Sequence, residues 1–246
     1  MIKNLFRISS TPGKTLLWLL LKKDLSSIRG DLGVDLAGGN MLNKFFFKTK
    51  RYISVDINQI KLSEGLEKYP DAIAVNETIQ NYLLKTNDKP NLIVCVQTFG
   101  TNMFFEHEEV LEVIKNMSKS LSFDGSMIFN VGGSSPDGQN FGDIELEELK
   151  DKLLPLLKTQ FHNVNFRYYG AMHYRFKIPR WKVTEDGMTK VEKKNFKGNG
   201  ILKKAKGFLK SIYILSLAFT MYIFPPLRHA FGKQKKYLYC FCYRKV

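Results

Sequence analysis

The sequence predicts an α/β fold in which helices cover both faces of a doubly wound, mostly parallel sheet. From residue 30 onward, short apolar runs rich in Val and Ile alternate with helical patterns. The runs are almost continuously apolar, as strands buried on both faces are. The composition agrees, because 246 residues with 44% apolar and 25% charged side chains are ordinary for a globular protein. Disordered, collagen-like and disulfide-scaffold chains are thereby excluded.

The first predicted element is a helix over residues 13–28, where leucines three and four apart form one apolar stripe. Lysines follow its apolar centre directly and no cleavage site is present, so we expect no signal peptide. A second clear helix is expected over 106–121, with acids at its start and lysines at its end, as the helix dipole prefers. Five strands are expected at 32–36, 52–55, 72–75, 92–96 and 126–131.

The last third of the chain continues this pattern and then departs from it. A helix over 145–157, interrupted at Pro155, is followed by a strand over 163–169, and an aromatic strand over 237–243 ends the chain. We therefore expect three parts: a core (1–172), an insertion (173–236) with an apolar helix at 207–224, and a last core strand (237–246).

The charge is distributed unevenly along the chain. Residues 1–172 carry 20 Lys and Arg against 20 Asp and Glu, whereas residues 173–246 carry 18 against 3. The whole excess of +15 therefore lies in the last third. This favours a neutral domain fused to a cationic, surface-seeking segment over a uniformly basic nucleic-acid-binding protein.

The stretch GVDLAGGN (33–40) is the most informative, because it ends one strand and is expected to open a helix. Small residues at such a turn allow a ligand close to the backbone, and the amides of a helix start would face that ligand. Asp56 comes 21 residues after Asp35, at the end of the second strand. A carboxylate there can accept both hydroxyls of a ribose, so the pair predicts a nucleoside-containing cofactor.

Asp35, Leu36, Ala37, Gly38 and Gly39 resemble the D-x-G-x-G motif of the class I S-adenosylmethionine-dependent methyltransferases, with alanine for the first glycine. The third glycine of a nicotinamide fingerprint is absent. The resemblance covers residues 30–131, and it implies a seven-stranded sheet with an antiparallel last strand. Two positions depart from that family's pattern. Asn91 stands where the family often has an acid at the start of the fourth strand, and SFDGS replaces its usual K-P-G-G.

The resemblance also implies roles for individual residues. The cofactor-binding set would be Asp35, Ala37, Gly38, Gly39, Asp56, Ile57, Asn76, Glu77, Val96 and Gln97. Within it, Asp35 and the turn would face the methionine part, Asp56 the ribose, and Asn76 or Glu77 the adenine. Val96 and Gln97 would border the cofactor and the substrate.

Methyl transfer to a hydroxyl is helped by a general base, and histidine is a usual choice. His107 and His173 are the two candidates, because both follow strands at the edge where ligands bind. His107 can equally be a solvated residue at a helix start. No spacing of His, Cys or acids suggests a metal, and no nucleophile elbow suggests a hydrolase.

The apolar stretch 207–224 carries only Lys210 and has lysines on both sides. We expect it to lie at an anionic membrane surface, on the inner face of the cytoplasmic membrane, because a crossing would separate the last strand from its sheet. Burial against the domain or in a dimer is the alternative; nucleic acid is disfavoured because aromatic and basic residues are segregated.

Relatives of this layout look like methyltransferases of bacterial surface-glycan or lipid-linked sugar assembly. The predicted function is thus O-methylation of a membrane-associated acceptor such as a lipid-linked sugar or surface polysaccharide. An isoprenoid or phenolic lipid acceptor and a catalytically silent nucleoside-binding scaffold are the alternatives. The acceptor atom, the base and the oligomeric state are left open by the sequence.

Overall fold

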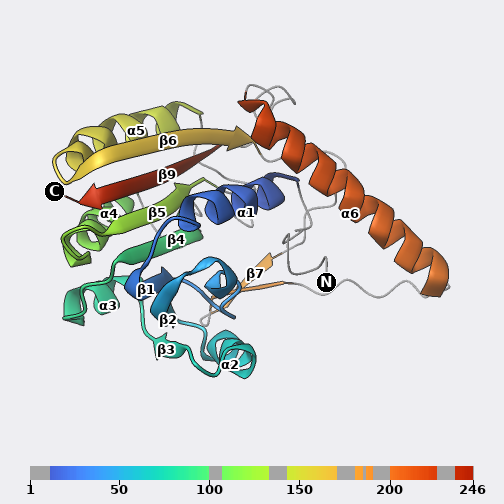
Figure 1. Ribbon diagram of the computed structural model, residues 1–246, viewed down its shortest axis with the longest axis horizontal. Helices are drawn as coiled ribbons and strands as arrows, with labels where there is room; N and C mark the ends of the chain where they lie inside the picture. Colours follow the sequence, from blue (N-terminus) through green and yellow to red (C-terminus); the bar gives the residue numbers. More distant parts are fainter. Residues whose placement is uncertain are drawn as a thin grey trace.

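The computed structural model describes residues 12–99, 107–132, 143–170, 181–184, 187–190, 200–225 and 236–245. Seven strands form one sheet in the order β3 (Ile73–Asn76), β2 (Thr49–Asp56), β1 (Gly30–Leu36), β4 (Leu92–Phe99), β5 (Ser126–Val131), β9 (Lys236–Lys245) and β6 (Phe161–Gly170). Neighbours are parallel except that β9 runs antiparallel to both β5 and β6 (Figure 1). The expected doubly wound, seven-stranded sheet with an antiparallel last strand is confirmed.

Helices form a layer on each face of this sheet, as predicted. The helices are α1 (Pro12–Leu25), α2 (Gln59–Lys68), α3 (Ile79–Lys85), α4 (His107–Ser120), α5 (Asp143–Lys158) and α6 (Gly200–Ile223). One buried cluster joins the sheet to α3, α4 and α5, and a second joins it to α1, α2 and α6. Alternate residues of β4 pack into the two clusters. Ile93 and Cys95 belong to the first cluster, and Leu92 and Val94 belong to the second.

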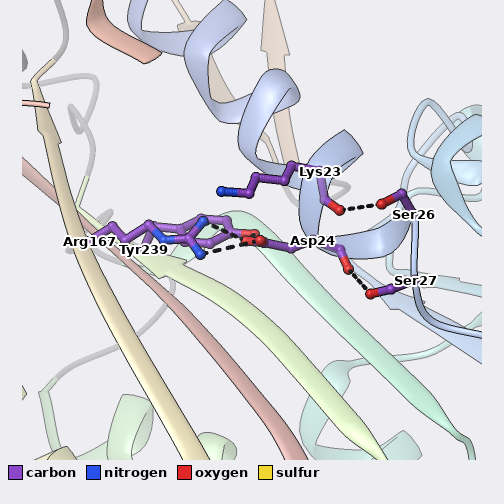
Figure 2. A network of polar contacts seen from close by, with 6 residues as sticks. All are labelled: Lys23, Asp24, Ser26, Ser27, Arg167 and Tyr239. Atoms are coloured by element: carbon purple, nitrogen blue, oxygen red, sulfur yellow. Dashed lines mark hydrogen bonds and ion pairs between the residues drawn. The ribbon is translucent and has the colours of Figure 1, made fainter. Parts of the chain in front are cut away.

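Helix α1 is attached to β9 and to the edge strand β6 by a largely buried polar network (Figure 2). The Arg167 guanidinium of β6 donates to both carboxylate oxygens of Asp24, at 2.8 and 3.3 Å. The Tyr239 hydroxyl of β9 donates to the same carboxylate at 2.9 Å. Asp24 is the penultimate residue of α1, so this network anchors the C-terminal end of that helix across β9 and β6.

The segment between β1 and β2 corrects the sequence prediction. A helix was expected after the glycine turn, but residues 37–48 form turns and one short 3-10 helix, η2 (Lys44–Phe46). Met41 adopts a left-handed φ of 57°, which a right-handed helix does not allow. Phe46 is buried and stacks on Trp18 of α1 with ring centroids 6.2 Å apart, so aromatic packing occupies the space.

Two further expectations are corrected. Helix α5 is not interrupted at Pro155 but runs through it to Lys158. The proline removes one backbone hydrogen bond, and burial of Leu153 and Leu157 on either side of it holds the helix together. The insertion is also more structured than expected, because β7 (Trp181–Thr184) and β8 (Gly187–Lys190) form an antiparallel pair.

Helix α6 begins at Gly200, seven residues before the predicted start, and ends at Ile223. Its C-terminal half packs beside α1 through Ile214, Ala218 and Met221, while the other end extends away from the sheet (Figure 1). Among the described residues, none of the helices combines the length and the apolar character that a membrane crossing needs.

Candidate functional site

The glycine turn and the end of β2 are joined by direct hydrogen bonds. Asp56 Oδ2 accepts the Gly39 N–H at 2.8 Å, and its Oδ1 accepts the Asn58 N–H at 2.9 Å. The Gly38 N–H donates to the Val55 carbonyl at 3.2 Å. Because β1 and β2 are parallel neighbours, their carboxyl ends lie at one edge, and these bonds bring the predicted ribose acid against the predicted turn.

The turn requires its two glycines for different reasons. A Cβ on Gly38 would lie 2.4 Å from Ser54 Oγ and 2.9 Å from Asp35 Oδ2, so any side chain there collides with β1 and β2. Gly39 has a φ of +50°, which glycine adopts without strain, and a Cβ there would stand 3.5 Å from Asp56 Oδ2. Ala37 has a left-handed φ of 53° and, unlike a glycine, is therefore strained there.

Asp35 lies beneath this turn and is fully buried. Its Oδ2 accepts the Tyr52 hydroxyl at 2.7 Å, and its Oδ1 accepts the Asn43 amide at 3.1 Å. Burial, followed by the charge of Asp35, raises the pKa of Tyr52 well above 10, so the phenol keeps its proton and donates. Contact of Asp35 with the methionine part stays a prediction; its oxygens bind these two side chains.

The end of β3 contributes Asn76 and Glu77 to the same edge. The Asn76 amide donates to the carbonyls of Asp56 and Ile57, at 3.0 and 2.9 Å. Glu77 accepts from the Asn81 amide at 2.9 Å and from Lys85 Nζ at 3.0 Å. These two donors, with the Thr78 N–H, lower the pKa of Glu77 to about 2. An adenine contact for either residue stays a prediction.

The carboxyl end of β4 is irregular at the predicted substrate side. Val96 is buried, whereas Gln97 is exposed and has a left-handed φ of 64°, and the pairing with β5 shifts between Cys95 and Phe99. The Gln97 N–H donates to the side-chain oxygen of Asn130 at 2.6 Å. Strained, bulged strand ends of this kind concentrate at functional sites.

Asn130 is a site residue that the sequence reasoning missed. It is buried on β5, and its amide also donates to the Tyr169 hydroxyl of β6 at 3.1 Å. The only sequence signal was an asparagine inside an otherwise apolar strand, FNV. Asn130 thus links the ends of three strands, β4, β5 and β6, at the same edge.

Neither candidate base can be placed against this edge. His107 is the first residue of α4, which follows β4, and its side chain lies outside the described residues, as does the whole of His173. His162, on β6, is exposed. Among the residues that the structure describes, no group of His, Cys, Asp or Glu could hold a metal ion.

No protein-family model matches this sequence, and no curated protein matches it. Solved structures of similar fold include the plantazolicin methyltransferase BamL in complex with a triazolic desmethylPZN analog and SAH. It is 12% identical, with a TM-score of 0.49, over 95% of this chain and 85% of that one. N-methyltransferase NodS from Bradyrhizobium japonicum, with S-adenosyl-L-homocysteine, is 16% identical with a TM-score of 0.44, over 63% of this chain and 76% of that one.

TehB from Haemophilus influenzae is 19% identical to this chain, with a TM-score of 0.46, over 69% of this chain and 58% of TehB. Each of these similarities is one of fold.

Proposed function

We propose that this chain is an S-adenosylmethionine-dependent methyltransferase. The observation that carries the proposal is a glycine turn that is bonded to Asp56 and followed by no α-helix. Dinucleotide sites place a pyrophosphate at the N-terminus of the helix that follows such a turn. S-adenosylmethionine has a ribose but no phosphate, so the acid and the turn can bind it without the N-terminus of a helix.

The residues at the turn fit a ribose. Each Asp56 oxygen accepts one N–H within the protein, and a carboxylate oxygen can accept a further hydrogen bond. Gly39 leaves open the space beside that carboxylate which a Cβ would take. Asp56 would therefore hold the ribose hydroxyls, with the turn against the methionine part and Val96 and Gln97 beside the reacting groups.

When bound, the cofactor supplies a methyl group made electrophilic by a positively charged sulfur. The protein's task is to align the acceptor in line with that methyl group and to exclude water. For a hydroxyl acceptor, an O–C bond forms as the C–S bond breaks, and the hydroxyl proton passes to a base. His107 and His173 remain our candidates for that base. We propose that Gln97, exposed near the end of β4, borders the acceptor and helps to orient it.

Calorimetric titration tests the cofactor. We expect micromolar binding of S-adenosylmethionine and none of NAD. Asp56→Ala removes charge-assisted hydrogen bonds worth about 1.5 to 3 kcal/mol each, so affinity should fall at least tenfold. Asp31→Ala is the matched control, because Asp31 is exposed near the opposite end of β1 and pairs with Lys50 at 2.8 Å. Binding of NAD alone, or an unchanged Asp56→Ala, would refute the proposal.

We further propose that the acceptor is membrane-associated and that α6 docks the protein at the lipid surface. The inward side of α6 buries Ile214, Ala218 and Met221. Its other sides expose an apolar surface, which we call the α6 surface: Phe208, Leu209, Ile212, Tyr213, Phe219 and Ile223, continued by Phe224. Such an exposed patch on one helix is typical of an interaction site.

The excess of basic residues in the last third of the chain favours an anionic lipid surface as the partner of the α6 surface. Residues 173–246 carry 18 basic against 3 acidic side chains, and a dimer through α6 would bring two such segments together. At an anionic leaflet, each basic residue instead contributes about 1 kcal/mol, and the apolar side chains insert at the interface. Helix α6 spans about 36 Å at 1.5 Å per residue, so the α6 surface can lie flat along a bilayer.

Flotation with phosphatidylglycerol vesicles tests this docking. Deleting α6 would expose the core that it covers, so we choose the triple variant Phe208→Ser, Ile212→Ser, Phe219→Ser. The control is Leu84→Ser, Phe123→Ser, since these apolar side chains are at least as exposed but belong to α3 and to the turn between α4 and β5. We expect the triple variant to lose flotation and the control to keep it. A wild-type dimer that the triple variant dissociates, without flotation, would refute the proposal.

The proposed acceptor is a hydroxyl of a lipid-linked sugar or surface polysaccharide. Methyl-labelled cofactor, incubated with separated membrane lipid fractions, tests this. Label in the lipid-linked sugar fraction supports the assignment. Label only in sugar-free isoprenoid or phenolic lipids would contradict it, and cofactor binding without label anywhere would indicate a silent scaffold.

A further inference from the structure

The glycine turn at the end of β1 needs a support other than a helix. In doubly wound folds the helix after such a turn fixes it, whereas here residues 37–48 form only turns and a three-residue 3-10 helix. Three residues of the segment, Ala37, Gly39 and Met41, have left-handed φ angles of 53°, 50° and 57°. A turn with two strained residues persists only when its surroundings hold it.

The surroundings that touch the turn are a buried polar cluster formed by Asp35, Tyr52 and Asn43. The Gly38 backbone rests on it so closely that a Cβ would lie 2.9 Å from Asp35 Oδ2. That same oxygen accepts the Tyr52 hydroxyl at 2.7 Å, and the Asn43 amide binds the other oxygen at 3.1 Å. The carboxylate is thus fixed by one donor from β2 and one, Asn43, that directly precedes η2 in the turn segment.

Tyr52 is itself held rigidly. Its side chain is buried, its ring packs edge-on against Phe47 with centroids 4.8 Å apart, and Lys44 Nζ lies 5.4 Å from the ring centroid. Phe47 and Lys44 belong to the segment that returns from the turn to β2. The phenol therefore connects the floor of the turn to the chain that follows it.

We propose that Tyr52 is a positioning residue for the cofactor, acting through Asp35 to hold the glycine turn in its binding conformation. The inference rests on the proposed function, because the turn is taken to bind S-adenosylmethionine. It assigns to a buried hydroxyl the support that a helix gives in other doubly wound folds. Loss of that hydroxyl should weaken cofactor binding more than it weakens the fold.

The chain contains a matched control for this hydroxyl. Tyr239 is also buried, also donates to a buried carboxylate, Asp24, at 2.9 Å, and packs in the same face of the sheet. Its bond anchors α1 to β9, and two strands, β4 and β5, separate β9 from β1. Tyr52→Phe and Tyr239→Phe therefore remove the same chemical group, one beneath the turn and one remote from it.

The experiment is calorimetric titration of S-adenosylmethionine into the full-length wild type, Tyr52→Phe and Tyr239→Phe, with the melting temperature of each. We expect both variants to melt lower than the wild type. The dissociation constant should rise about tenfold in Tyr52→Phe and stay within twofold in Tyr239→Phe. If Tyr52→Phe does not fold, Asn43→Ala, which removes the other donor to Asp35, takes its place with the same criterion.

Two outcomes overturn the inference while the proposed function stands. In one, the wild type binds and Tyr52→Phe binds equally well. In the other, both phenylalanine variants lose affinity to the same extent, so that the effect is general loosening of the fold. A wild type that does not bind S-adenosylmethionine overturns the proposed function, and the inference with it.

Discussion

Replacing Arg167 with methionine tests how α1 is held on the sheet. In the wild type the guanidinium donates at 2.8 and 3.3 Å to an Asp24 side chain that is only 4% exposed. Removing one partner of a buried pair costs about 3–5 kcal/mol. The Arg167 side chain is 24% exposed and Tyr239 still donates to Asp24, so we expect a smaller loss than for a fully buried pair, about 2–3 kcal/mol.

At roughly 2–4 °C per kcal/mol for a domain of this size, Arg167→Met should melt about 5–10 °C below the wild type. Circular dichroism during heating measures this. Asp24→Asn combined with Arg167→Met removes both charges but keeps an acceptor for the buried Tyr239 hydroxyl, so it should recover much of the loss, because no buried carboxylate is left unpaired. A melting temperature of Arg167→Met within 2 °C of the wild type would refute the reasoning.

Two further predictions concern the site. Ala37→Gly removes the strain of an alanine in the left-handed region, which costs the fold about 1–2 kcal/mol, but it also raises the entropy of the unfolded chain, which costs about 0.4–1 kcal/mol. The melting temperature should therefore rise by about 1–3 °C. A fall would mean that packing of the Ala37 methyl group outweighs the strain. Glu77 has its pKa lowered from 4.5 to about 2, so its ionised form stabilises the fold above pH 4.5 and this contribution is lost as the pH falls toward 2. The melting temperature of Glu77→Gln should lie below that of the wild type at pH 7, and the difference should disappear near pH 2. A difference that does not change with pH would show that the ionised Glu77 carboxylate is not the stabilising group.

Much of the fold was determined by local sequence patterns. Apolar runs of four to six residues separated by turn residues predicted the first five strands, and in β1, β2, β4 and β5 most of each run is buried on both faces. Spacings of three and four residues predicted α4, which buries one stripe, and also α1, which is buried on further sides where α6 packs against it. The distance from Asp35 to Asp56 likewise predicted a turn and an acid at neighbouring strand ends, which Gly39 and Asp56 confirm.

Only the tertiary structure decided how the turn is supported. Sequence reasoning expected a helix after Gly39, but the left-handed Met41 and the burial of Phe46 against Trp18 exclude one. The polar partners of the site, Tyr52 for Asp35 and Asn130 for Gln97, are 17 and 33 residues distant along the chain.

The same holds for the end of α1 and for the course of α5. Arg167 is 143 residues from Asp24, and Tyr239 is 215 residues from it (Figure 2). Helix α5 continues through Pro155 because the sheet buries the leucines around it. The periodicity of apolar residues indicates which side of an element is buried, so the sequence determined the elements and the strand ends where the site lies. Periodicity does not indicate which distant group will hydrogen-bond to a buried polar atom, because that pairing forms only when the strands assemble.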